Sequence, residues 1–260
     1  MAFKKRPDED AAAEDPTGWL IAGSLAEFLL LHTDQIRYMA MFGYTYLHGV
    51  KLFPTLPKDS ALSFKFVSMI FQCVGGGILV PLFINSIPVP LSTDAYPIAI
   101  FASFLLHQYF PILRDVVLLS PLLKTAFIVL YECQRAAVVT KLTLAAAATI
   151  APSDFSSMAV FGPIFCGAVS GCGGAFLPLN KGLSPIEKTG LAQPMLSALI
   201  AATCLHFFIG TSLSDGVVEA KKKAQVVMAI YFIVYNLYST FAPTYLASTK
   251  TQNGESKKIK

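Results

Sequence analysis

The sequence has few charged residues. Only 14% of its 260 residues are Asp, Glu, Lys or Arg, whereas 54% are hydrophobic and the mean hydropathy is +0.58. A chain with this much apolar surface cannot hide all of it in one core, so an ordinary soluble domain is excluded. The net charge of +4 is too small, and too widely spread over loops and ends, for a nucleic-acid-binding surface. The composition therefore predicts an integral membrane protein.

Motifs for catalysis and metal binding are also missing. The sequence has no Ser, His and acid set in a catalytic context, no zinc signature and no phosphate-binding glycine loop, so an enzyme is the weaker class. Residues 1–16 are polar and have no apolar core of a signal peptide, so we expect the first spanning helix to direct insertion. The cysteines lie in apolar stretches and are interpreted as small buried hydrophobic residues: Cys73, Cys133, Cys166, Cys172 and Cys204.

Long apolar runs predict an all-α membrane protein with seven transmembrane helices. Each span needs about 20 apolar residues, and runs such as 126–131 and 226–235 lack the alternation of β-barrel strands. A polar disordered tail covers residues 1–16, and a short helix precedes the first span. The spans are expected at about 32–51, 61–83, 96–118, 120–148, 158–179, 193–213 and 223–246.

Two halves of the chain carry the same landmarks in the same order. Each half has an acidic residue three positions before an arginine, a glycine 41 positions after that acid, and a Leu-His pair about 32 positions further on. The landmarks are Asp34, Arg37, Gly75 and His107 in the first half, and Glu132, Arg135, Gly173 and His206 in the second. The two histidines are interpreted as hydrogen-bonded core residues. The offset between the halves is about 98 positions.

This repeat predicts the organisation of the domain. Residues 17–118 form a first three-helix unit and residues 119–214 a second one, followed by a seventh helix within 215–247 and a basic tail at 248–260. Because each unit has three spans, the second starts on the opposite side of the membrane, and the repeat is inverted. Channels and transporters built in this way place their pathway between the two units.

Glycine clusters occur in both central spans. They are Gly75, Gly76 and Gly77 in the first unit, and Gly171, Gly173 and Gly174 in the second. Small residues let helices pack closely in lipid, which is one interpretation. The other is a kink that turns backbone groups toward a water-filled pore. Three adjacent glycines exceed the needs of one packing contact, which favours the kinked pore.

Charged residues inside the predicted spans are the second candidate site. Asp34 with Arg37, and Glu132 with Arg135, are three positions apart and share a helix face. A charge at bilayer depth costs at least about 2.5 kcal/mol, so we expect buried ion pairs. Alternatively, Arg135 together with Lys124 binds an anionic lipid phosphate or sets the electric field along the pore. The two interpretations are compatible.

The distribution of positive charge predicts a cytosolic C-terminus. In this orientation the cytosolic side carries most of the basic residues, namely Lys51, Lys58, Lys65, Arg114, Lys181, Lys188 and the tail lysines. Lys141 and Lys221 to Lys223 fall on the other side and are not explained. Residues 257–260 (Lys-Lys-Ile-Lys) resemble the dilysine signal that returns membrane proteins to the endoplasmic reticulum.

Four segments occur in a characteristic order: residues 71–79 (FQCVGGGIL), residues 109–115 (YFPILRD), Glu132-x-x-Arg135 and residues 171–174 (GCGG). Their order and spacing resemble the trimeric intracellular cation (TRIC) channels, in particular an invertebrate-like member. The resemblance covers about residues 32–245. The family motif on the fourth span is Lys-Glu-x-x-Arg, with the lysine and arginine meeting lipid phosphates. Tyr131 stands at the lysine position here, so Arg135 alone carries that role over, unless Lys124 replaces the lysine.

The resemblance implies a homotrimer with one potassium-permeable pore per subunit in the endoplasmic or sarcoplasmic reticulum membrane. It also implies counter-ion current for calcium release, functional coupling to calcium-release channels, and a bound phosphoinositide such as phosphatidylinositol 4,5-bisphosphate. Two alternatives remain from the residues themselves. A secondary transporter can use the same inverted repeat, whereas a seven-span receptor predicts no repeat.

Overall fold

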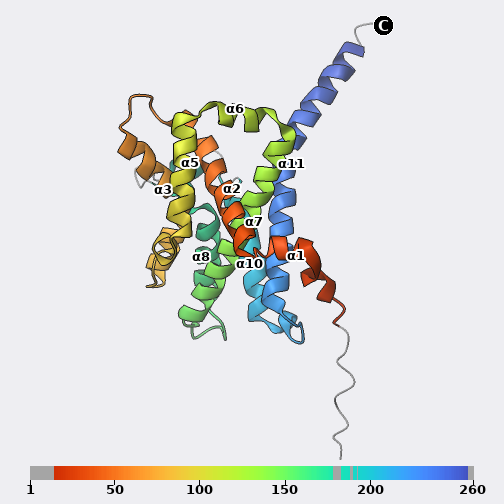
Figure 1. The fold of residues 1–260 in the computed structure, drawn as a ribbon. Coiled ribbons are helices and arrows are strands. Elements are labelled where there is room, and N and C mark those ends of the chain that lie inside the picture. Colours follow the sequence, from red (N-terminus) through yellow and green to blue (C-terminus); the bar gives the residue numbers. More distant parts are fainter. Residues whose placement is uncertain (1–14, 178–182, 188–189, 192, 257–260) are drawn as a thin grey trace, which may run out of the picture.

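The computed structural model describes residues 15–177, 183–187, 190–191 and 193–256, which form helices joined by turns and loops (Figure 1). The described residues contain no strand, and the all-α prediction is confirmed. Several sequence predictions fall outside these residues: the tail at 1–14, the end of the fifth span at 178–179, Lys181, Lys188 and the dilysine sequence at 257–260.

Each of the seven predicted spans corresponds to a helix. These are α2 (Asp34–Leu52), α3 (Leu62–Phe83), α5 (Ala95–Tyr109), α7 (Pro121–Thr149), α8 (Phe161–Cys172), α10 (Met195–Gly210) and α11 (Ala220–Ser256). Shorter helices lie before or between them: α1 (Gly23–Leu29), α4 (Val89–Ser92), α6 (Ile112–Leu119) and α9 (Ser184–Glu187). The helix α11 runs on to Ser256, through most of the predicted basic tail.

Local sequence explains where α2 and α7 begin. The Thr33 hydroxyl accepts a hydrogen bond from the Ile36 backbone N–H at the start of α2. The Ser120 hydroxyl does the same for Leu123 at the start of α7, and Pro121 takes the first helical position, where no N–H is needed.

Within the described residues, two helices are long and apolar enough to cross a membrane by length and composition alone. They are α3 and the segment 220–242 of α11, and the bent pair α5 and α6 is a third if it counts as one span. The helix α7 is longer, with 29 residues, but it carries Glu132 and Arg135 in its middle. Both side chains are buried inside the protein, so α7 does not present these charges to lipid.

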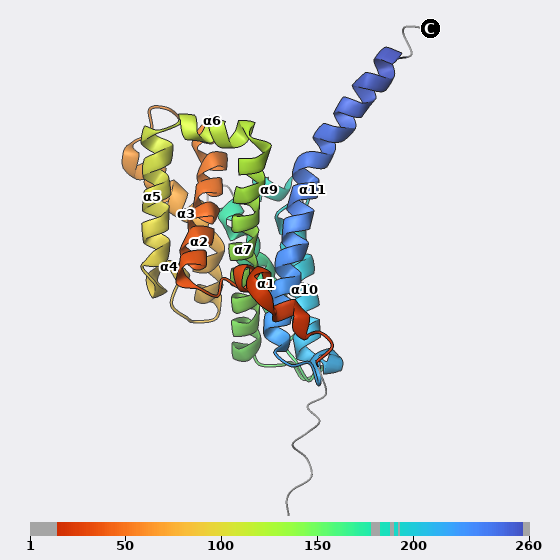
Figure 2. The ribbon, with the colours of Figure 1, turned by 45° about the vertical axis from the view of Figure 1, so that its right-hand side comes forward.

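The predicted third span at 96–118 is wrong in extent. The chain breaks between Tyr109 and Ile112, and α5 meets α6 at 98°, so that α6 lies across one end of the bundle (Figures 1 and 2). Pro111 is the physical reason, because proline removes a backbone donor and disfavours the helical conformation of the preceding residue. Phe110 accordingly has φ −126° and ψ 60°.

The two three-helix units run in opposite directions. Both views show α2 rising where α7 descends, and Figure 1 shows α3 descending where α8 rises (Figures 1 and 2). The seventh helix α11 stands outside the repeat and packs against α7 and α10 through a core that includes Cys133, Ala136, Ala201, Ala229 and Phe232. This arrangement confirms the predicted inverted repeat with an additional helix.

Lys223, which the charge distribution did not explain, is buried at the start of α11. Its ammonium bonds to the Asp15 carboxylate and, at 2.7 Å, to the Thr17 hydroxyl. This contact attaches the segment before α1 to α11.

Cys204 departs from the expected burial of the cysteines, because its side chain is exposed on α10.

Candidate functional site

The two central helices bend at equivalent positions. Within α3, Val74 leaves the helical conformation with φ −121° and ψ 17°. The helix α8 ends at Cys172, which has φ −141° and ψ 0° and is followed by a short 3-10 turn, η3 (Gly173–Phe176). Val74 and Cys172 are separated by the repeat offset of 98 positions. The predicted kinks are therefore present in both units and have the same backbone geometry.

The glycine clusters meet each other at these bends. A methyl group added to Gly76 would lie 2.4 Å from the Ser170 carbonyl oxygen, and one added to Gly174 would lie 2.1 Å from the Gln72 carbonyl oxygen. Ser170 is the repeat equivalent of Gln72, so each contact recurs with the two units exchanged. This reciprocity is what a two-fold axis between the units requires.

The remaining glycines separate into two groups. Gly75 and Gly173 take part in the same crossing, since a methyl group on either would come within 2.7 Å of the backbone of the opposite cluster. Gly77 faces Val89, and Gly171 faces Ala198 and Val139. Close packing and kinking, which the sequence left as alternatives, thus occur together at one backbone crossing, which we call the seam.

A small cavity of about 100 Å³ opens beside the seam. Its lining consists of Tyr44, His48, Lys51, Gln72, Gly76, Tyr131, Pro194 and residues 170–175. The Tyr44 and Tyr131 rings stack with centroids 4.8 Å apart, and the Lys51 ammonium lies 5.4 Å from the centroid of the Tyr131 ring. Lys51 therefore brings a positive charge to Tyr131, at the position where the resemblance expects a lysine.

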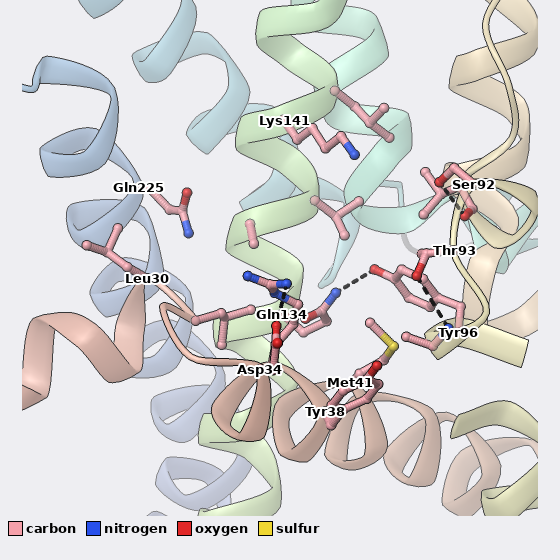
Figure 3. Close-up of a pocket in the computed structure, with 17 residues that line it drawn as sticks. Leu30, Asp34, Tyr38, Met41, Ser92, Thr93, Tyr96, Gln134, Lys141 and Gln225 are labelled. Atoms are coloured by element: carbon pink, nitrogen blue, oxygen red, sulfur yellow. Dashed lines mark hydrogen bonds and ion pairs between the residues drawn. The ribbon is translucent and has the colours of Figure 1, made fainter. Parts of the chain in front are cut away.

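A large cavity of about 450 Å³ lies toward the other end of α2 (Figure 3). Its polar lining includes Asp34, Arg37, Tyr96, Gln134 and Lys141. On α2 the linings of the two cavities come as close as Met41 and Tyr44, and on α7 as close as Gln134 and Tyr131. Three residues of helix correspond to about 5 Å, so roughly one turn separates the cavities.

Arg135 is enclosed by protein. Its side chain is 1% exposed and forms an ion pair with Glu132 at 3.1 Å. The guanidinium also donates to the Gly171 carbonyl at 2.9 Å, the Pro194 carbonyl at 2.5 Å and the Ser197 hydroxyl at 3.0 Å. These bonds connect α7 to α8, to α10 and to the residue preceding α10. All three guanidinium nitrogens donate within the protein, so this geometry does not favour lipid-phosphate binding by Arg135.

The seventh helix completes this network. The Asn236 amide donates to the second carboxylate oxygen of Glu132 at 2.5 Å, and the Arg135 guanidinium lies 4.2 Å from the centroid of the Phe232 ring. Both residues belong to α11. The Glu132–Arg135 pair is thus buried and fully partnered, as predicted.

Three further predicted residues behave differently from expectation. Asp34 and Arg37 form an ion pair at 3.0 Å, but their side chains are 75% and 51% exposed. The prediction that this pair is buried is wrong within the protomer, because no helix among the described residues covers the two side chains. Lys124, expected to act with Arg135, lies 5.4 Å from the centroid of the Phe241 ring on α11.

The histidine prediction is confirmed. His107 is 1% exposed, and its Nε2 bonds to the Tyr46 carbonyl at 2.9 Å; His206 is 4% exposed and bonds to the Ala159 carbonyl at 2.6 Å. Both side chains join helices or loops within the core of a unit.

Sequence reasoning missed four polar residues of the site: Lys51, Tyr96, Gln134 and Asn236. Gln134 and Asn236 carried a usable signal, because an amide inside an apolar span needs a partner. Lys51 looked like an ordinary flanking charge. The Tyr96 hydroxyl gave no signal, because tyrosine is common near the ends of spans.

No protein-family model matches the chain, and no curated protein matches it significantly. A solved structure of a trimeric intracellular cation channel from C. elegans, in the absence of Ca²⁺, has a similar fold. The TM-score is 0.61 at 17% sequence identity, and the match covers 87% of this chain and 94% of that chain. At this identity the likeness concerns the fold, and the resemblance suggested by the sequence is confirmed at that level.

Proposed function

We propose, from this shared TRIC-like fold, that the protein is a cation channel whose ion path follows the seam between its two units. The observation that carries the proposal is the pair of matched bends at Val74 and Cys172, with the small cavity beside the seam and the large cavity about one helical turn from the small one. Bent backbone at bilayer depth is tolerated where it is shielded from lipid and lines a cavity.

The chemistry of the lining supports a cation as the permeating ion. Carbonyl, amide and hydroxyl oxygens can replace the hydration shell of potassium, and such groups line both cavities. The Glu132 carboxylate is neutralised by Arg135, so no strong fixed charge traps the ion there. We therefore propose a potassium-selective or weakly selective passive pore.

A secondary transporter is the second candidate. About one turn of helix closes the route between the two cavities, and a closed centre flanked by two cavities is also what alternating access requires. The fold shared with a channel favours conduction over coupled transport.

The proposed assembly is a homotrimer with one pore per protomer in the endoplasmic or sarcoplasmic reticulum membrane, with a cytosolic C-terminus. Its current balances charge during calcium release, in functional coupling with calcium-release channels. The name of the structurally similar protein supports the trimer and the intracellular membrane. The mass of the complex in nanodiscs tests this assembly, and a monomeric mass contradicts it.

An anionic lipid headgroup is proposed as a ligand beside the small cavity. Lys51 lies close enough to Lys124, Glu132 and Arg135 to interact electrostatically, and Arg135 and Glu132 neutralise each other. Lys51 and Lys124 remain as positive charges that would repel a cation, and a phosphoinositide such as phosphatidylinositol 4,5-bisphosphate would compensate them. Replacing both lysines by Gln should reduce retention of this lipid in native mass spectrometry. Retention equal to that of the wild type contradicts the site.

Planar-bilayer recording of the purified protein tests the proposed channel. With potassium on both sides, a channel gives unitary current steps that correspond to many ions per second. A sodium gradient then measures the ion preference. Flux at fixed stoichiometry without unitary steps would support the transporter, and the absence of any flux would contradict both functions.

A further inference from the structure

A polar bridge between the two units lies in the lining of the large cavity. The Gln134 side-chain amide, on α7, donates to the Tyr96 hydroxyl, on α5, at 2.5 Å. Figure 3 shows the two side chains pointing toward each other among the residues that line the cavity. Each residue is 4% exposed, and they belong to different three-helix units. The bridge therefore joins the two units at the place where the route between the cavities is closed.

This bridge breaks the symmetry of the repeat. The position equivalent to Gln134 in the first unit is Ile36, and the position equivalent to Tyr96 in the second unit is Pro194. Neither side chain can form such a bond. The glycine crossing is matched in both units, whereas this bridge exists in one orientation, so it is an addition to the repeated scaffold and not a product of it.

The carbonyl oxygen of the Gln134 side chain is buried and has no hydrogen-bond partner among the described residues. Buried polar atoms are normally satisfied, and an exception calls for a specific reason. An amide oxygen is chemically equivalent to the backbone carbonyls that coordinate potassium in selectivity filters. The charged side chains on the same cavity are Asp34 and Arg37, which pair with each other, and the exposed Lys141.

We infer that the Gln134–Tyr96 bridge is the gate of the ion path, and that the side-chain oxygen of Gln134 is a ligand of the permeating cation once the bridge opens. The inference rests on the proposed function as a cation channel. Opening needs the loss of one hydrogen bond and a rotation of the Tyr96 ring, which a small shift of α5 against α7 can supply.

Single-channel recording of two bridge variants and one control tests the inference. Tyr96→Phe keeps the ring and removes the hydroxyl, so open probability should rise about fivefold, the equivalent of one net hydrogen bond. Gln134→Leu removes both the donor and the oxygen, so it should also open more often but with lower unitary potassium conductance. Tyr109→Phe is the matched control, because Tyr109 lies on the same helix as Tyr96 with an exposed side chain and lines neither cavity, and it should behave as the wild type.

Each result of this experiment has a distinct meaning. Wild-type gating in Tyr96→Phe together with wild-type conductance in Gln134→Leu would overturn the inference while the channel function stands. Absence of current from the wild-type protein would overturn the channel function and the inference with it. Gln134→Met, which keeps the side-chain length without the amide, replaces Gln134→Leu if thermal unfolding shows that the leucine variant does not fold.

Discussion

Two acid–arginine pairs occupy equivalent positions of the repeat and have opposite environments. Asp34–Arg37 and Glu132–Arg135 have the same spacing, and their contact distances are 3.0 Å and 3.1 Å. The first pair is 75% and 51% exposed, whereas both members of the second are 1% exposed. The second pair is covered by α8 and α10, which accept hydrogen bonds from Arg135, and by α11, which stands outside the repeat and supplies Asn236 and Phe232. The role of a pattern repeated in the sequence thus depends in part on a helix that is not repeated.

The largest expected effect follows from breaking the buried pair. Arg135→Met leaves the Glu132 carboxylate buried without its cation, and we expect the free energy of unfolding to fall by about 3–5 kcal/mol. Arg37→Met at the exposed pair should change it by less than about 1 kcal/mol. Reversible unfolding in detergent micelles measures both variants.

A double variant separates loss of charge from loss of packing. Glu132→Gln combined with Arg135→Met removes both charges and should recover part of the stability that Arg135→Met loses. Equal small losses for Arg135→Met and Arg37→Met would show that the two environments do not differ in the membrane protein.

The glycine crossing should respond in the same way in both units. Gly76→Ala and Gly174→Ala each force a methyl group against a carbonyl oxygen, at 2.4 Å and 2.1 Å, and overpacking of this kind costs about 1–3 kcal/mol. Gly18→Ala is the control, because its methyl group would meet its nearest neighbour at an ordinary 3.8 Å. Thermal unfolding of the three variants measures the effect. Loss of stability in one unit alone would contradict the two-fold relation at the seam.

The ion pair between Asp15 and Lys223 is intermediate in exposure between the two acid–arginine pairs, with side chains 25% and 4% exposed. Hydrogen bonds from Lys223 and Thr17 lower the pKa of the Asp15 carboxyl below its ordinary value of 3.8. A lowered pKa stabilises the contact fully above pH 3.8, and the stabilisation is lost as the pH falls through the lowered value. Hydrogen exchange of residues 15–22, corrected for the intrinsic rate, should therefore increase only below pH 3.8.

The variant Asp15→Asn removes this titration. Its exchange at neutral pH should already be faster than that of the wild type and should show no further rise in acid. Unchanged exchange in the variant would mean that apolar contacts of α1, and not the ion pair, hold this segment against α11.

Local features of the sequence predicted most of the scaffold. The fourth span was expected to begin at residue 120, next to the start of α7 at Pro121, and the glycine clusters marked both bends. The extent of the third span and the burial of Asp34 were predicted wrongly, and each error has a physical cause. Pro111 ended α5 where the hydropathy of the surrounding residues continued, and the exposure of Asp34 depended on the absence of a covering helix.

The site was predicted less completely than the scaffold. Arg135 was found because a charge inside an apolar span is conspicuous, but its hydrogen-bond partners come from segments up to 62 positions away. The Tyr96–Gln134 bridge joins residues 38 positions apart in different units. The sequence around an uncharged polar residue does not show which distant residue its side chain will contact.

By itself, the sequence determined that the chain is a helical membrane protein with an inverted repeat and bends at two glycine clusters, because apolar run length, spacing and backbone freedom are local properties. Only the tertiary structure decided which acid–arginine pair is buried, where the cavities lie and which side chains close the route between them. These outcomes depend on which helix packs against which face, and the free energy of burying a charge or an amide is set by neighbours that are distant in the chain.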